Sequence, residues 1–396
     1  MRKFQDMNVP LLRMMAVVAI FACSPPFAYA QTPGSLRERE IKSSIEKLEG
    51  ELHTSGAASW EEWFERLQPF RKELGGLMEF SIKNQVSPQS GPLLHIHSPG
   101  LPPLYAGTLS ANFLTAFGQP PAQFLDKPSI APIVLVSTWL KSQGVDLLFV
   151  PVPTKIEIYT NRIVKSCPPD GIANPLLRKL LHTLLEQDVE VVDLLPPYLN
   201  AAKGSSELLF LPTDHHWSER AQRIAADEIV ARLKRYAFVS TALKQPRMFH
   251  TDRVPMKWRP DKGYLLDSLT PDEREIVRSY PYPTESVTRT LDHSNQPYIE
   301  PNDGPVLVMG DSLTHFFKIA IEAGSGIDAM LAEGLNLNVS NISMASATIQ
   351  PIEELLRSRQ RLKVHRVVIW IFSMESLLSP TGWDLPPLPG AVALAH

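Results

Sequence analysis

PVLVMGDSLTHFFKIAIEAG, at residues 305–324, joins a short apolar run to an amphipathic segment. The first six residues are apolar and β-prone, which is typical of a strand buried in a parallel sheet. The apolar residues that follow recur at helical spacing and share one face: Leu313, Phe316, Phe317, Ala320 and Ile321. The stretch therefore predicts a strand, a tight turn permitted by Gly310, and a helix.

Ser312 stands at this turn, within the sequence Gly-Asp-Ser. A serine between a buried strand and a helix lies at the carboxyl edge of the sheet. There its hydroxyl is exposed, and the helix offers backbone N–H groups to an oxyanion. The position favours a nucleophilic Ser312. The alternative is that Ser312 only caps the helix.

Strand and helix signals alternate through residues 146–372. Strands are predicted at 146–153, 189–194, 335–343 and 364–372, and further helices at 174–187, 218–236 and 351–360. This alternation predicts an α/β fold of three layers, with a mostly parallel sheet flanked by helices.

Residues 1–30 have the features of a secretory signal peptide: Arg2 and Lys3, a short apolar core, and the ending Ala-Tyr-Ala. We expect cleavage after Ala30, and the alternative is a lipoprotein signal with Cys23 acylated. Cleavage would leave Cys167 as the only cysteine, so no internal disulfide is expected. The expected location is a bacterial periplasm.

The rest of the chain divides by composition. Residues 31–90 read as a charged, helical lead-in, and residues 91–380 as the α/β domain, which includes a long polar excursion at 237–304. Within the excursion, Tyr280 and Tyr282 are candidates for stacking on sugars, and the alternative is a surface excursion with its own small core. Residues 381–396 form a Pro-rich tail that we expect to be poorly ordered.

Charge argues against a nucleic acid partner, and hydropathy argues against a membrane-spanning segment after residue 30. The formal net charge of −3 and the pI of about 6.4 provide no basic field of the kind that nucleic acid binding needs. No stretch after the expected signal is apolar enough to cross a membrane.

A second motif, LPTDHHWSER at residues 211–220, supplies the base that a serine nucleophile requires. In an extended segment residues two apart point the same way, so Asp214 lies beside His216 while His215 faces elsewhere. Asp214 then orients one ring nitrogen of His216, and the other faces Ser312. Ser218 is the expected cap of the helix that follows.

The same cluster allows two other interpretations. Asp214, His215 and His216 are residue types that zinc accepts, but adjacent residues rarely converge on one ion, and nothing brings His95 or His97 near them. We therefore predict no metal. Trp217 is expected in the core or in a cleft wall, where it is also a candidate for contacting substrate.

Three motifs in this order resemble one family: FVPVPTK at 149–155, TDHHW at 213–217 and GDS at 310–312. Together they are similar to the periplasmic alginate O-acetyltransferases of the AlgJ and AlgX type, over roughly residues 140–380. The resemblance implies an SGNH-hydrolase-like domain whose triad is Asp214, His216 and Ser312. Ordinary SGNH esterases carry an Asp-x-x-His pair after the serine, whereas here Asp-x-His precedes it, which favours the acetyltransferase branch.

The resemblance also implies a reaction. An acetyl group supplied by a membrane-bound O-acyltransferase would pass through Ser312 to a hydroxyl of an exported polysaccharide, beside other exopolysaccharide secretion proteins. No cofactor is expected. Backbone N–H groups at Ser312, Leu313 and Ala345 are the oxyanion candidates. Lys155 is a further candidate for contacting substrate, and the alternative is a solvated structural lysine.

The sequence departs from the family pattern at two places. Ala345 and Ser346 stand where the family commonly has a glycine, and Glu375 stands where an arginine is expected. The acceptor therefore stays open between alginate, cellulose and another exopolysaccharide. Two other functions also remain: an esterase with the same triad, and a non-catalytic scaffold that holds polymer in a secretion complex.

Overall fold

The computed structural model describes residues 34–83, 93–94, 104–105, 130–211, 214–256, 271–272, 274–275, 286–344, 349–377 and 383–389. Its centre is a sheet of five strands in the order β4-β3-β9-β7-β8. Every pairing in this sheet is parallel. The strands are β3 (Asp146–Val152), β4 (Glu190–Val191), β7 (Val306–Gly310), β8 (Val339–Ser343) and β9 (Val367–Ser373). The predicted α/β class with a mostly parallel sheet is confirmed.

The central strands β3, β7 and β9 are buried almost throughout, which explains why their sequences read as continuous apolar runs. Their register brings Val152 beside Ser373 and Gly310 beside Ile371 and Ser343. The carboxyl ends of four strands therefore share one edge of the sheet. The strand predicted at 189–194 is shorter than expected, since only Glu190 and Val191 pair with β3.

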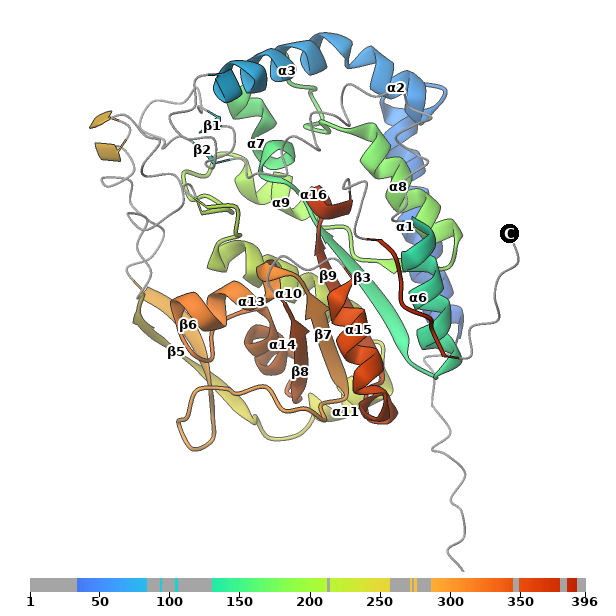
Figure 1. Cartoon of the computed structure of the whole chain (residues 1–396), viewed down its shortest axis with the longest axis vertical. Helices are drawn as coiled ribbons and strands as arrows, with labels where there is room; N and C mark the ends of the chain where they lie inside the picture. The colour runs from blue at the N-terminus through green and yellow to red at the C-terminus, as the bar shows by residue number, and fades with distance from the viewer. Residues whose placement is uncertain are drawn as a thin grey trace, which may run out of the picture.

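Helices cover both faces of the sheet (Figure 1). On one face lie α6 (Ile130–Ser142), α8 (Pro175–Glu186) and α15 (Gln350–Arg357), and on the other α10 (Glu219–Leu233) and α14 (Ile327–Leu335). This distribution is what right-handed crossovers between parallel strands require. The shorter helices are α7 (Lys155–Ile163), α9 (Leu195–Ala202), α11 (Ala237–Ala242), η4 (Arg359–Lys363) and α16 (Met374–Leu377).

The helix predicted after Gly310 divides into two parts. It begins as α13 (Ser312–Phe316) and continues as a π-helix, η3 (Phe317–Ile321). Such π segments are uncommon and often occur at functional sites.

The lead-in is helical, as predicted, and consists of α1 (Gly34–Thr54), α2 (Trp60–Arg66) and α3 (Gln68–Lys83). It packs on α8, where Trp60 and Trp63 are buried. Arg178 of α8 is 2% exposed and bonds both carboxylate oxygens of Glu51 in α1, at 2.8 Å each, while it also binds Asp193. The lead-in is therefore part of the same core as the sheet.

Part of the excursion forms a two-stranded antiparallel ribbon, β5 (Phe249–Pro255) with β6 (Ser286–Asp292). Tyr298 follows it with a buried ring, and its hydroxyl donates to the Val339 carbonyl at 2.7 Å. Its ring also meets Phe249 edge-on. A two-residue pairing of β1 (Leu93–Leu94) with β2 (Leu104–Tyr105) lies elsewhere in the chain.

The expected disorder of the tail is wrong for residues 383–389. Trp383 is buried against Phe372, with 5.3 Å between the ring centroids, and Leu385 and Leu388 also pack on the core. The expected signal peptide at 1–30 lies outside the described residues, as do His95 and His97. Within the described part of the chain, no helix is both long and apolar enough to cross a membrane.

The attachment of the lead-in is testable at two adjacent residues of α8. Replacing Arg178 by Met leaves the largely buried Glu51 without its cation and Asp193 with only Lys47, 4.0 Å away, and we expect a loss of about 3–5 kcal/mol in the free energy of unfolding. Lys179→Met, which removes a more exposed pair with Glu61, should cost less than about 1 kcal/mol. Urea unfolding measures both, and equal losses would show that the lead-in is not held by the buried pair.

Candidate active site

The turn after β7 is shaped by close packing against β9. A Cβ at Gly310 would lie 2.4 Å from the Ile371 carbonyl oxygen, which only glycine avoids. Asp311 follows as the N-cap of α13, and its Oδ1 accepts the Leu313 N–H at 2.9 Å. The cap is therefore Asp311 and not Ser312, and the alternative assignment of Ser312 as a cap is wrong.

Asp311 also fixes the turn to the neighbouring strand, because its Oδ2 accepts the Ser373 N–H at 3.1 Å. Burial raises the pKa of Asp311 to about 6, against the lowering effect of these two N–H groups and of His216. The Leu313 N–H, which the sequence offered as an oxyanion donor, already has an acceptor in Asp311. The Ser312 N–H therefore stays as the oxyanion candidate in this turn. Ala345 lies outside the described residues.

Two short segments, 209–211 and 214–218, pair antiparallel beside this edge, and together they are called the turn at 209–218. Phe210 and Trp217 form an antiparallel bridge, and the Leu211 N–H donates to the His216 carbonyl at 2.9 Å. Ser218 caps α10 as predicted, because its hydroxyl accepts the Ala221 N–H at 3.3 Å. The turn thus ends where α10 begins.

Lys155 ties this turn to the sheet. The side chain begins at the first residue of α7, just after β3, and its ammonium donates to the carbonyls of Leu211 and Asp214. Lys155 is buried. Neither sequence interpretation holds, since a buried lysine bound to two backbone carbonyls is neither a substrate contact nor a solvated residue.

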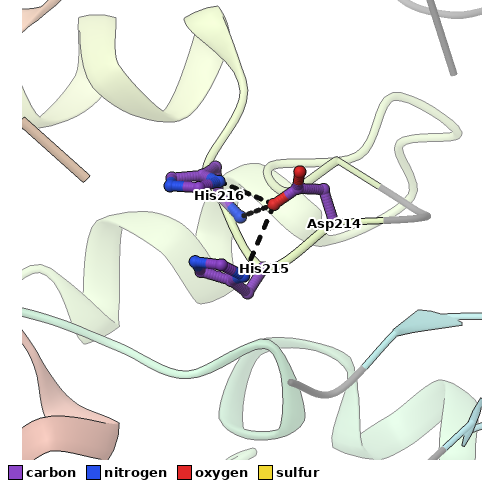
Figure 2. A group of neighbouring side chains, drawn as sticks. All are labelled: Asp214, His215 and His216. Atoms are coloured by element: carbon purple, nitrogen blue, oxygen red, sulfur yellow. Dashed lines mark hydrogen bonds and ion pairs between the residues drawn. The ribbon is translucent and has the colours of Figure 1, made fainter. Parts of the chain in front are cut away.

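The predicted pair of Asp214 and His216 is present (Figure 2). His216 Nδ1 lies 2.6 Å from Asp214 Oδ1, which also accepts the His216 backbone N–H at 3.1 Å. Burial alone would raise the pKa of Asp214, but the hydrogen bond and charges of the two histidines lower it to about 2. With Nδ1 donating to the Asp214 carboxylate, Nε2 is the ring nitrogen that can accept a further hydrogen bond. His216 Nε2 is buried and has no hydrogen-bond partner among the described residues.

Two contacts set this pair against α13. The His216 ring stacks on Phe316, with 4.0 Å between centroids and 10° between planes. Phe316 is four residues after Ser312, and residues four apart share a helix face, so His216 lies on the face that carries Ser312. Trp217 Nε1 donates to the Leu313 carbonyl at 2.8 Å.

Trp217 itself is fully buried, with 0% of its surface exposed. The core interpretation is therefore confirmed, and the prediction that Trp217 contacts substrate is wrong. Its role is to join the turn at 209–218 to the start of α13. The other aromatic candidates, Tyr280 and Tyr282, lie outside the described residues.

His215 does not face away as predicted. Its Nδ1 lies 3.5 Å from Asp214 Oδ1, and its ring centroid is 4.1 Å from that of His216. One possible ligand atom from each of Asp214, His215 and His216 lies within 4.8 Å of the others. Asp214 Oδ1 and His216 Nδ1 are already bonded to each other and are therefore not free for an ion. The geometry thus favours a histidine oriented by Asp214 over a metal site. Burial, with the charges of His216 and Lys155, lowers the pKa of His215 to about 4.

Comparison with known proteins finds similar sequences. A family model described as the SGNH hydrolase-like domain of the acetyltransferase AlgX matches residues 117–374. A Pseudomonas fluorescens protein described as a probable alginate O-acetylase, AlgJ, is 28% identical over 179 residues, which are 44% of this chain and 43% of that protein. The chain thus spans less than half the length of this relative.

Two solved structures are similar in fold. The O-acetyltransferase domain of Pseudomonas putida AlgJ is 22% identical with a TM-score of 0.48, and the match covers 65% of this chain and 84% of that one. Pseudomonas aeruginosa AlgX is 15% identical with a TM-score of 0.46, over 65% of this chain and 59% of the other.

The Asp214–His216 pair predicts a pH dependence of stability. The folded pKa of Asp214, about 2, lies below the ordinary value near 4, so the stabilisation is present above about pH 4 and is lost as pH falls through 2. Asp214→Asn should lower the free energy of unfolding by roughly 2–3 kcal/mol at pH 6, and the difference from the unsubstituted protein should shrink toward pH 2. Urea unfolding between pH 2 and 7 measures it, with the exposed Asp227→Asn as control. A difference that does not change with pH would contradict this account.

Proposed function

The chain belongs to the AlgX family of SGNH hydrolase-like acetyltransferase domains, and from this premise we propose that it moves acetyl groups through Ser312 onto hydroxyls of an exported polysaccharide. One observation carries the proposal: the hydrogen bond from His216 Nδ1 to Asp214 leaves a buried Nε2 that has no partner in the described part of the chain. This nitrogen belongs to a ring stacked on the helix that begins with Ser312.

In the first step His216 Nε2 takes the proton of the Ser312 hydroxyl, and Oγ attacks the carbonyl carbon of the acetyl donor. The donor oxygen leaves with the proton that His216 carried, so an acetyl ester of Ser312 forms. Asp214 stabilises the imidazolium while it exists, which is why a carboxylate of low pKa suits this position.

In the second step a sugar hydroxyl takes the place of the donor. His216 Nε2 removes its proton, the sugar oxygen attacks the acetyl carbon, and the proton returns to Ser312 Oγ as the ester bond breaks. The histidine ends each cycle neutral, as it began. Water in place of the sugar hydroxyl would give hydrolysis, so the acceptor that reaches the acetylated Ser312 decides between transferase and esterase.

The oxyanion that forms in both steps needs nearby N–H donors. The Ser312 N–H stands in the first turn of α13, where the helix N-terminus favours negative charge. Loss of one such donor typically costs about 10²–10³ in rate.

We propose the periplasm as the location and a membrane-bound O-acyltransferase as the acetyl source. The basic start and apolar core of residues 1–30 support export. The likeness to a protein described as a probable alginate O-acetylase supports alginate or a related polymer as the acceptor.

Mass spectrometry of the intact protein tests this function. Incubation with an activated acetyl ester should add one acetyl group to the protein but not to Ser312→Ala, and added oligosaccharide should remove the group and become acetylated. Loss of the acetyl group mainly to water would contradict transfer in favour of an esterase. Absence of any adduct, with polymer still bound, would overturn catalysis and leave a scaffold.

A further inference from the structure

The direction of the Ser312 N–H, the oxyanion candidate in the turn after β7, is set by the peptide unit to which it belongs. This unit joins Asp311 to Ser312, so the N–H shares one plane with the Asp311 carbonyl. In a trans peptide the two groups point in opposite directions, and no peptide bond in the described part of the chain is cis. Whatever holds the Asp311 carbonyl therefore aims the Ser312 N–H.

Thr314 holds this carbonyl from the side of α13. Its hydroxyl donates to the Asp311 carbonyl oxygen at 2.8 Å, and its backbone N–H donates to the same oxygen at 3.2 Å. Thr314 is 2% exposed, and a Cβ at Gly310 would lie 3.0 Å from both its Oγ1 and its Cγ2. The side chain is thus packed closely against the turn and stays on the carbonyl.

Strand β8 holds Thr314 from the other side. Thr314 Oγ1 lies 2.6 Å from the hydroxyl oxygen of Ser343, at the carboxyl end of β8. Ser343 in turn donates to Asn341 Oδ1, and Asn341 Nδ2 donates to the buried Asp328 of α14 at 3.0 Å. Thr314 therefore shares its one hydroxyl proton between the Asp311 carbonyl and Ser343, and such three-centre bonds are common at helix ends.

A hydrogen bond to a carbonyl oxygen also changes the N–H of the same amide. It draws electron density toward the oxygen and leaves the N–H more positive, and in a protein interior successive hydrogen bonds strengthen one another in this way. A donor that is already aimed and polarised stabilises an oxyanion better than one that must reorient as the charge develops. Thr314 is thus placed to act on the reaction without touching the substrate.

We propose that Thr314 is a positioning residue: its hydroxyl orients and polarises the Ser312 N–H through the Asp311 carbonyl. The inference rests on the proposed function, in which an oxyanion forms beside this N–H in both steps. The polar chain from Ser343 to Asp328 keeps Thr314 in place. The strength of the oxyanion donor is therefore set in part by a side chain two residues after the nucleophile.

Trifluoroacetone, a ketone that resembles an acetyl group, separates this effect from the rest of the reaction. Ser312 Oγ bonds to its carbonyl carbon, the hydroxyl proton passes to His216 Nε2, and the carbonyl becomes a C–O⁻ group, so a hemiketal forms without a leaving group. Fluorine NMR of the bound adduct against pH measures the pKa of the hemiketal hydroxyl. A stronger oxyanion donor lowers this pKa, because it favours the charged form.

Three substitutions of Thr314 test the proposal. Thr314→Val keeps the shape but removes the hydroxyl, and it should raise the hemiketal pKa by about one and slow acetylation of Ser312 by an activated acetyl ester about tenfold. Thr314→Ala should do the same, and it serves where valine crowds Gly310. Thr314→Ser retains the hydroxyl and should keep both values close to those of the unsubstituted protein. Thermal unfolding verifies that each variant is folded.

The matched control is Thr290 of β6. It is also 2% exposed, and its hydroxyl donates to the Ala329 carbonyl at 3.1 Å. Thr290→Val therefore removes an equally buried threonine hydroxyl from a carbonyl outside the turn. It should lower the temperature of unfolding as Thr314→Val does, but it should leave the hemiketal pKa unchanged.

A hemiketal pKa that is the same in folded Thr314→Val and Thr314→Ala as in the unsubstituted protein would overturn the inference and leave the proposed function in place. An equal rise in Thr290→Val or in Thr314→Ser would also overturn it, because stability or packing would then explain the effect. Absence of the acetyl adduct in the unsubstituted protein would instead overturn the function, and the inference with it.

Discussion

The site depends on one buried cation. Lys155 leaves the carboxyl end of β3 and donates to the carbonyls of Leu211 and Asp214, in a turn nearly 60 residues further along the chain. A buried ammonium without acceptors would be very unfavourable, so the turn is fixed where it supplies them. Because Asp214 is held in this way, the orientation of His216 follows from a short hydrogen bond between near neighbours. The sheet edge, the turn and His216, the proposed general base, therefore form one unit.

A second set of contacts holds Ser312, the proposed nucleophile, to the same unit. Asp311 caps α13 and also accepts an N–H from the end of β9, so the position of Ser312 is fixed to the central strand. Trp217 Nε1 donates to the carbonyl of Leu313, the residue after Ser312, and the His216 ring lies on Phe316. The His216 ring thus packs on α13 four residues after Ser312, and movement of either segment would disturb contacts of the other. The proposed proton transfer from Ser312 to His216 requires such fixed positions, because its efficiency depends on the hydrogen-bond distance between the two side chains.

The sequence predicts the sheet well, because buried parallel strands are continuous apolar runs. It also predicts that Asp214 pairs with His216, although the extended backbone on which that prediction was based is absent. It predicts poorly where distant segments meet. Lys155 is expected at the surface by its residue type, and only the folded chain brings Leu211 to it. The helix α7 was missed although Thr154 and Glu157 form a capping box, a signal that the sequence contains. His215 lies beside Asp214 because the Asp214 N–H donates back to the Leu211 carbonyl, so the backbone is not extended there and alternation does not apply.

The central claim is that His216, oriented by Asp214, acts as the base for Ser312. The most direct measurement is the rate at which a sulfonyl fluoride labels Ser312, followed by peptide mass spectrometry, in the unsubstituted protein, Asp214→Asn, His216→Ala and the double variant. The account predicts that His216→Ala slows labelling by about 10²–10⁴-fold and that adding Asp214→Asn slows it little further, because the two residues act as a unit. Labelling that is unaffected by His216→Ala, or that occurs on a residue other than Ser312, would contradict it.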